Sequence, residues 1–349
     1  METLKVLWIS DFPLRGSSFG TVTHELLTRM PPDFSFDVLS LGYKGVPLKI
    51  NENIRILELE KAHQLHYYFN KLRPDVTVVF HSFWLLDSMQ TELSIMPGKK
   101  ILYIPCEGET IPNEYLRLFS QFDIVATPSE FSRRVMKKYG IEARVIPHGV
   151  DTEFFKPRDK PWHEFRFGYL GMNDIRKQVP RIMEAYARLK EGLLVLATPE
   201  NGAYKLSYLA KQYNITPIFI ETKMHDLTMT REAVRDFLQS LDVYISPASE
   251  SFGLPALEAQ ACGVPVIALE AGASPEVLGN GALYCNAADY LETSVGKVAL
   301  ISVPDLYRKM RFLIQVREAY MKTAQKALEN AKKWPWENAV EKLKKVIEE

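Results

Sequence analysis

The feature that most constrains the fold is a regular alternation of short apolar runs with helix-length amphipathic segments along almost the whole chain. The apolar runs are rich in β-branched residues, and they include 4–10 (LKVLWIS), 75–80 (DVTVVF), 123–128 (DIVATP), 165–171 (FRFGYLG) and 242–249 (DVYISPAS). Strands that alternate with helices predict parallel sheets, with ligand sites at the carboxyl ends of the strands. The predicted fold class is therefore α/β, built from Rossmann-like units.

The chain length indicates more than one domain. At 349 residues it exceeds the size at which a single hydrophobic core stops growing. The regular pattern breaks near residue 160, where Pro157 and Pro161 lie among clustered charges, which is typical of a linker. We expect Rossmann-like domains over 1–160 and 161–333 with parallel sheets facing a central cleft, and a closing helix over 334–349.

Composition excludes several classes of protein. Forty-three basic and 43 acidic residues give a formal net charge of zero, which argues against a general nucleic-acid binder. The three cysteines are far apart and lack metal-binding spacing, so we expect buried thiols in a reducing compartment. No apolar run reaches the roughly 20 residues of a membrane span, and the N-terminus lacks a signal-peptide pattern. These features predict a cytoplasmic protein.

One strand-loop-helix segment stands out, residues 249–266 (SESFGLPALEAQACGVPV). Pro255 suits the first turn of a helix, so the backbone N–H groups of Phe252, Gly253 and Leu254 are expected to point outward from the helix start. A helix N-terminus attracts phosphate through unpaired donors and its dipole, and a glycine lets a bulky anion approach closely. The segment therefore predicts a phosphate site.

Two carboxylates flank this phosphate site. Glu250 lies in the loop before the helix, and Glu258 lies about one turn inside it. Carboxylates are poor partners for phosphate but good acceptors for sugar hydroxyls. One acid on each side of a diphosphate is the arrangement that a nucleotide-sugar donor requires, with the ribose on one flank and the transferred sugar on the other.

This segment resembles the signature of a known protein family. ESFGLPALE followed by AQACGVPVIA is similar to the E-x7-E signature of the family-four retaining glycosyltransferases, which have the GT-B fold. Three further segments resemble the family in the same order: VIPHGVDTEFFKP its interdomain crossing, AGASPEVLGNGALYCNAAD its G-x-x-E loop, and WPWENAVEKL its closing helix, which in that fold crosses back to the first domain.

The resemblance implies roles for both domains. The N-terminal domain is expected to bind the acceptor and the C-terminal domain the nucleotide-sugar donor. Glu258 is expected to bind the ribose, and Glu250 the donor sugar close to the reacting carbon, as a catalytic residue. The remaining implied donor contacts are Ser251, Phe252, Gly253, Leu254 and, in the G-x-x-E loop, Glu276.

The basic pair of the family departs from its usual pattern in this chain. The family carries G-R-x4-K-G after the first strand of the second domain, where this sequence reads LGMNDIRKQ from Leu170. Gly171 and Lys177 match, so Lys177 is expected to neutralise the leaving phosphate and Gly171 to approach the donor. Met172 replaces the arginine and Gln178 a glycine. Two neighbouring residues are candidates for the second positive charge: Arg176, the first choice, and Arg181.

The N-terminal half departs from the family at two further places. Gly16 stands in the loop after the first strand, where the family has Gly-Gly near the phosphates and the acceptor, so the resemblance implies that Gly16 contacts the donor. The loop lacks the G-x-G-x-x-G spacing that a dinucleotide-binding dehydrogenase requires. Glu107 lies where many members carry a histidine facing the donor sugar. Glu107, His81 and His148 are candidate contacts for the acceptor or the sugar, because each lies close to the end of a predicted strand.

The function expected from the resemblance is that of a retaining glycosyltransferase, and a hexosyl group is the expected transferred sugar. The donor sugar is transferred from a nucleoside diphosphate to an acceptor hydroxyl by front-face attack. No Asp-x-Asp motif is present, so we expect neither a metal nor a cofactor beside the donor. A nucleotide-sugar epimerase and an inactive sugar-nucleotide-binding protein stay open as alternatives.

The sequence does not identify the substrates. The base of the nucleotide is expected near residues 221–234 (ETKMHDLTMTREAV). Glycan, lipid and small-polyol acceptors all stay open. The basic segment 129–140 (SEFSRRVMKKYG) also leaves open a peripheral contact with the inner face of the membrane.

Overall fold

The computed structural model describes residues 3–14, 16–159, 164–222 and 229–349, and the chain forms two compact units. Unit 1 comprises Met1–Cys106, Thr110–His148 and Trp336–Glu349, and unit 2 comprises Glu107–Glu109 and Gly149–Pro335. The boundary follows His148 and precedes the expected linker at residue 160. The reason is that Val150 donates to the Trp334 carbonyl at 2.8 Å and Phe155 is fully buried, so this stretch already packs in unit 2.

Unit 1 is built on one large sheet with the strand order β3-β4-β2-β1-β5-β6-β7-β8. All neighbouring pairs are parallel except β3 and β4. The central strand β1 is buried on both faces, as expected of a parallel strand covered by helices. The strands are β1 (Leu4–Asp11), β2 (Phe34–Leu41), β3 (Leu48–Asn51), β4 (Ile54–Glu58), β5 (Val76–Phe80), β6 (Lys99–Tyr103), β7 (Ile124–Thr127) and β8 (Ala143–Val145).

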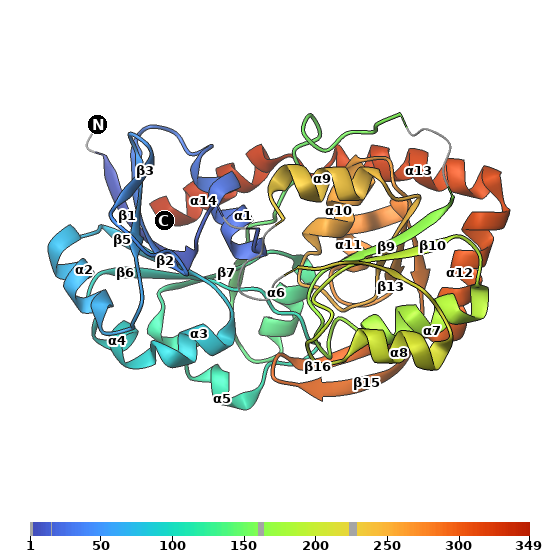
Figure 1. Ribbon diagram of the computed structural model, residues 1–349. Helices are drawn as coiled ribbons and strands as arrows, with labels where there is room; N and C mark the ends of the chain where they lie inside the picture. The colour runs from blue at the N-terminus through green and yellow to red at the C-terminus, as the bar shows by residue number, and fades with distance from the viewer. Residues whose placement is uncertain (1–2, 15, 160–163, 223–228) are drawn as a thin grey trace. The chain divides into compact units, whose positions relative to one another are not determined.

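Helices cover both faces of this sheet (Figure 1). The C-terminal helix belongs to unit 1, where it packs beside α1. On the other face, an apolar core joins the sheet to the remaining helices. The first face carries α1 (Ser18–Leu27) and α14 (Trp336–Glu348), and the second carries α2 (Gln64–Leu72), α3 (Phe83–Ser88), α4 (Gln90–Ile95), α5 (Asn113–Leu116) and α6 (Glu130–Lys137).

Unit 2 is built on a second, fully parallel sheet with the order β11-β10-β9-β12-β13-β14. An antiparallel hairpin of β15 and β16 lies beside it, and the sequence analysis did not predict this hairpin. The strands are β9 (Arg166–Leu170), β10 (Leu193–Ala197), β11 (Ile218–Ile220), β12 (Val243–Ser246), β13 (Val266–Leu269), β14 (Ala282–Cys285), β15 (Ala287–Thr293) and β16 (Gly296–Ile301).

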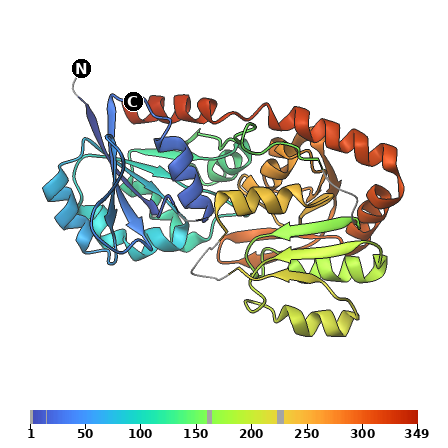
Figure 2. The same cartoon turned by 45° about the horizontal axis from the view of Figure 1, so that its top comes forward.

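Helices also cover both faces of the second sheet (Figures 1 and 2). One face packs through a buried apolar cluster against three of them, and α10 packs between α9 and α13 on the other face. The first group is α7 (Val179–Leu189), α8 (Leu206–Tyr213) and α12 (Val303–Gln315), and the second is α9 (Arg231–Gln239), α10 (Leu254–Ala261), α11 (Ser274–Leu278) and α13 (Arg317–Ala331).

The architecture confirms the predicted α/β class with two Rossmann-like parallel sheets. In such sheets the carboxyl ends of the strands form the ligand-binding edge. Within the described residues, no helix has both the length and the apolar character needed to cross a membrane.

Candidate functional site

The loop between β12 and α10 begins the site in unit 2. Gly253 lies at the N-cap of α10 with φ of 91°, a left-handed conformation that glycine adopts readily, and among the described residues no side chain caps this helix. The ring of Phe252 packs edge-on against Trp334, with centroids 5.3 Å apart. Ser251 and Leu254 are likewise largely buried. Because these side chains are used in packing, the loop would meet a ligand mainly with its backbone.

A second loop, which contains Gly272 and Ala273, packs against the backbone of Glu250. Ala273 donates from its backbone N–H to the Glu250 carbonyl at 2.8 Å. A Cβ on Gly272 would lie 2.6 Å from the same carbonyl oxygen, so only glycine fits there. This loop leads into α11, whose first turn carries the half-buried Glu276. The close packing fixes the backbone from which the Glu250 side chain extends.

Four charged side chains meet at this point in unit 2. Glu250 Oε1 lies 2.5 Å from Lys177 Nζ, and Glu250 Oε2 lies 3.2 Å from Arg176 Nη1. The other terminal nitrogen of Arg176 lies 2.9 Å from Oε1 of Glu107. The Glu107 backbone is held as well, because Ser249 Oγ donates to its carbonyl at 2.8 Å. We call Glu107, Arg176, Lys177 and Glu250 the charge cluster.

Within the charge cluster, the pKa values of Glu250 and Arg176 are shifted toward the charged forms. Burial acts to raise the pKa of Glu250, but the positive charges of Lys177 and Arg176 outweigh burial and lower this pKa below its usual value. Burial acts to lower the pKa of Arg176, and the carboxylates of Glu107 and Glu250 reverse this and raise it. Glu250 is therefore an ionised carboxylate at neutral pH.

The loop that carries the two bases is anchored by Gln178. This residue has φ of 53°, in the left-handed region, and only 3% of its surface is exposed. Its amide nitrogen donates to the carbonyls of Pro247 and Ala299 at 3.0 and 2.9 Å, and its amide oxygen accepts from Ile301 N at 2.8 Å. The left-handed backbone explains why the family has glycine here, and the three hydrogen bonds offset the cost of a side chain.

The structure separates the two candidates for the second positive charge. Arg176 belongs to the charge cluster, whereas Arg181 donates to the Ile301 carbonyl at 2.9 Å. Met172, which replaces the family arginine, is held by its backbone, because the Tyr169 hydroxyl donates to its carbonyl at 2.9 Å. A Cβ on Gly171 would lie 2.6 Å from the same hydroxyl oxygen, which explains the glycine.

Glu258 lies on α10 with only 4% of its surface exposed. Its Oε1 is 2.5 Å from Nη1 of Arg231, the first residue of α9. The Arg231 guanidinium also stacks over the ring of Phe155 at 4.7 Å from the centroid. Arg231 lies in the segment 221–234 expected near the base, but sequence reasoning missed its contact with Glu258, because no pattern links the start of one helix to the side of another. The residues 223–228 of the expected base loop lie outside the described residues.

The other candidates lie in unit 1. Gly16 is exposed and precedes Ser17, whose hydroxyl caps α1 by accepting from Gly20 N at 2.9 Å. His81 follows β5, and its Nε2 lies 3.0 Å from Oδ1 of Asp11 at the end of β1. Sequence reasoning missed Asp11, although a carboxylate that ends a buried strand was a usable signal.

His148 is packed in the core of unit 1. Its ring lies within 6.3 Å, centroid to centroid, of Phe80, Tyr103 and Trp336. Burial lowers its pKa to about 3, so the imidazole is neutral at physiological pH. Its role as a sugar contact stays a prediction.

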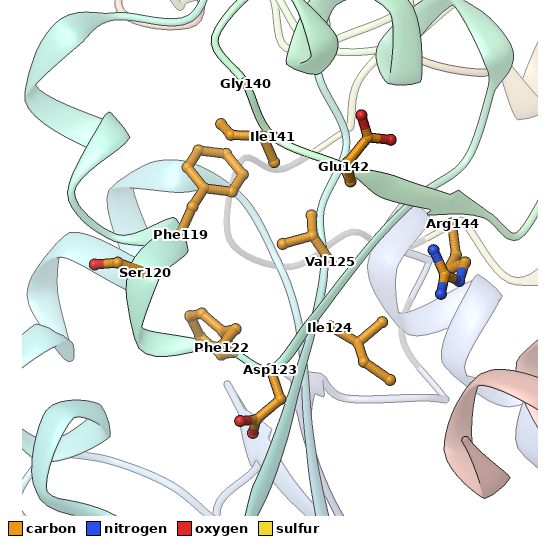
Figure 3. Close-up of a pocket in the computed structure, with 10 residues that line it drawn as sticks. All are labelled: Phe119, Ser120, Phe122, Asp123, Ile124, Val125, Gly140, Ile141, Glu142 and Arg144. Carbon is orange, nitrogen blue, oxygen red and sulfur yellow. The ribbon is translucent and has the colours of Figure 1, made fainter.

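A separate pocket of about 370 Å³ lies in unit 1, around the starts of β7 and β8 (Figure 3). None of the candidate residues named above lines it. Across the described parts of the chain, no group of three or more His, Cys, Asp or Glu side chains is placed to hold a metal ion. The pocket is lined by Phe119, Ser120, Phe122, Asp123, Ile124, Val125, Gly140, Ile141, Glu142 and Arg144.

Comparison with known proteins identifies a family match over the second half of the chain. The sequence profile described as Glycosyl transferases group 1 matches residues 150–333, which include the charge cluster residues of the second half and Glu258. A D-inositol 3-phosphate glycosyltransferase of Streptomyces bingchenggensis is 28% identical, over 50% of this chain and 45% of that protein. The chain thus spans less than half the length of this relative.

Solved structures share the fold at low sequence identity. Sucrose-phosphate synthase from Thermosynechococcus elongatus superimposes with a TM-score of 0.79 at 15% identity, covering 99% of this chain and 98% of that one. Anabaena HepE in complex with UDP and glucose gives a TM-score of 0.76 at 13% identity, covering 99% of both chains. These matches confirm the GT-B fold.

Proposed function

Because the chain belongs to the glycosyl transferases group 1 family, we propose that it transfers a sugar from a nucleoside-diphosphate sugar to an acceptor hydroxyl, with retention of anomeric configuration. The observation that carries the proposal is the pairing of Glu250 with Lys177 and Arg176 beside the uncapped start of α10. A structural neighbour in complex with UDP and glucose supports a nucleotide-sugar donor.

The donor is proposed to lie across the start of α10. Its diphosphate would be bound by the backbone N–H groups and dipole of the helix together with Lys177 and Arg176. Glu258, held by Arg231 through a 2.5 Å contact, would accept hydrogen bonds from the ribose. Glu250, ionised by its two basic neighbours, would accept a hydrogen bond from a hydroxyl of the donor sugar.

Catalysis on this site would consist of positioning and charge neutralisation. The bond between the anomeric carbon and the diphosphate oxygen breaks, and the bond to the acceptor oxygen forms on the same face of the sugar. The acceptor proton passes to the departing phosphate oxygen. Lys177 and Arg176 neutralise the negative charge that develops on that phosphate, so neither carboxylate needs to form a covalent bond.

Three variants test this proposal against a panel of UDP-, GDP- and ADP-sugars. Glu250→Gln removes the charge beside the reacting sugar, so turnover should fall by about a hundredfold or more while nucleoside-diphosphate affinity changes little. Glu258→Gln should weaken nucleotide binding by about tenfold, as expected for a lost charge-assisted hydrogen bond. Glu270→Gln, at an exposed acid of the same unit, is the matched control.

The products distinguish the alternatives. Release of nucleoside diphosphate with a glycosylated product supports transfer, whereas an altered sugar on an intact nucleotide indicates epimerisation. Nucleotide binding without turnover indicates an inactive binding protein. If Glu250→Gln and Glu258→Gln both behave like Glu270→Gln, the donor site lies elsewhere.

A further inference from the structure

A carboxylate and an imidazole meet at the ligand-binding edge of unit 1. The parallel strands β1 and β5 place Ile9 opposite Val79, so Asp11 and His81, each two residues further along, emerge side by side at the carboxyl ends. Asp11 Oδ1 lies 3.0 Å from His81 Nε2. On the opposite side of the ring, His81 Nδ1 lies 3.0 Å from the Ser82 hydroxyl.

His81 holds the Asp11 carboxylate at this edge of the sheet but has little exposed surface of its own for a ligand. Only 3% of its surface is exposed, and its ring is stacked on Phe19 with centroids 4.3 Å apart and planes 10° apart. Both ring nitrogens are already in hydrogen-bonding contact with neighbours of unit 1. The Asp11 side chain, by contrast, is 27% exposed, so its carboxylate is held in place and still reaches solvent.

An exposed tryptophan lies next to this pair. Trp84, in the first turn of α3, is 61% exposed. Its ring is 5.2 Å from the His81 ring, centroid to centroid, with an angle of 86° between the planes. Trp8 and Trp336 of the same unit are nearly fully buried. A large aromatic surface left in water next to a fixed carboxylate is typical of a binding site.

We propose that Asp11 and Trp84 form a saccharide-binding site in unit 1, with His81 as the positioning residue that fixes Asp11. The C–H groups on one face of a sugar ring would pack on the indole, whose face is electron-rich. The hydroxyls at the ring edge would donate to the Asp11 carboxylate. Taken with the proposed function, on which this reading rests, the bound saccharide is the acceptor.

The same residues disfavour a membrane or an anionic ligand. A lipid surface of the inner leaflet is negatively charged and attracts basic side chains beside the apolar ones. Here the His81 ring that Trp84 contacts also holds the carboxylate of Asp11, which repels anionic headgroups. A polyhydroxylated ring satisfies both the aromatic face and the hydrogen-bond acceptor.

Saturation-transfer NMR on the full chain tests the site with glucose, mannose, galactose, sucrose and myo-inositol as probes. We expect at least one probe to bind the wild type. Its affinity should fall at least about tenfold in Trp84→Ala, which corresponds to the loss of one stacking contact. Asp11→Asn should weaken the same signal. Tyr67→Ala, which removes a 58% exposed aromatic on α2 of the same unit, should leave it unchanged.

The role of His81 is tested by its own pair of variants. His81→Gln keeps a side-chain donor that can hold Asp11, so it should retain saccharide binding, whereas His81→Ala should lose it. Thermal denaturation of each variant checks that unit 1 is folded. Equal loss in both variants at unchanged stability would contradict the positioning role.

The outcome is separable from that of the proposed donor site. Trp84→Ala should leave nucleoside-diphosphate binding unchanged, because the proposed donor site lies in unit 2. A failure of nucleotide binding in the wild type would overturn the donor proposal, whereas the saccharide signal would still report on Trp84. The saccharide site is overturned if no probe binds the wild type or if the signal survives Trp84→Ala. It is also overturned if phosphatidylglycerol vesicles shift the tryptophan fluorescence of the wild type but not that of Trp84→Ala.

Discussion

Lys177 Nζ and Glu250 Oε1 lie 2.5 Å apart, with side chains that are 18% and 16% exposed. This contact, together with Arg176, holds the pKa of Glu250 below its usual value although burial acts in the opposite direction. The site therefore carries a carboxylate that stays ionised under acidic conditions that would protonate an ordinary glutamate. Its ionisation is linked both to stability and to the proposed reaction.

The pH dependence of activity should show this shift. Because the folded-state pKa of Glu250 is lowered, its stabilising contribution is present above the ordinary glutamate value of about 4.3 and is lost as the pH falls through the folded value. Lys177→Gln removes the nearest positive charge, so the pKa of Glu250 should rise and the acid limb of the kcat profile should move to higher pH. An unchanged limb would show that another group controls it. Measurements of unfolding against pH should move in the same direction.

Arg176 and Arg181 offer a direct comparison of two nearby arginines. Arg176→Gln removes the base that contacts both Glu107 and Glu250, so kcat should fall by about a hundredfold, the loss typical of a removed transition-state contact. Arg181→Gln removes only a hydrogen bond to the Ile301 carbonyl. It should lower stability by about 1 kcal/mol with kcat nearly unchanged. The reverse result would identify Arg181 as the second base.

Gln178 and Lys190 have similar left-handed conformations, with φ of 53° and 52°, but different surroundings. Gln178→Gly relieves backbone strain and removes three buried hydrogen bonds, so unit 2 should lose about 1–3 kcal/mol of stability. Lys190→Gly, at an exposed helix end, only relieves backbone strain. It should therefore raise the free energy of unfolding by about 1 kcal/mol. Urea denaturation measures both changes. Stabilisation by Gln178→Gly would mean that the amide contributes less than the strain costs.

The parts of the fold that local pattern determines were predictable. The buried run around Trp8 and the run around Tyr244 are strands because apolar, β-branched residues continue without a helical period, as in parallel sheets. Glu250 and Glu258 were placed by their spacing around a helix start, and Lys177 by its match to the basic pattern of the family that the sequence resembles. Arg176 followed as a neighbour of Lys177, and the structure brings it into the charge cluster.

Contacts between distant segments were not predictable in the same way. The approach of Glu107 to Arg176 joins positions far apart in the chain, and no local periodicity records it. The β15–β16 hairpin was missed because its outward residues, such as Tyr290 and Glu292, make β15 largely exposed and give it no buried run. His148 follows a strand as expected, but its packing against the rings of Phe80, Tyr103 and Trp336 brings together positions that no local pattern links.

Arg231 and Arg235 lie one turn apart on α9 and allow the environment of Glu258 to be tested. Arg231 contacts the Glu258 carboxylate and stacks on Phe155, whereas Arg235 stacks on Phe154 and pairs with Asp236. Arg231→Met leaves a buried carboxylate without this positive neighbour.

We therefore expect Arg231→Met to weaken nucleoside-diphosphate binding by about tenfold, as when one partner of a charge-assisted hydrogen bond is lost. Isothermal titration calorimetry measures the affinity, and Arg235→Met is the matched control that should bind like the wild type. Because Arg231 acts through Glu258, the double variant with Glu258→Gln should be no weaker than the worse single variant. Additive losses would mean that Arg231 contacts the nucleotide on its own.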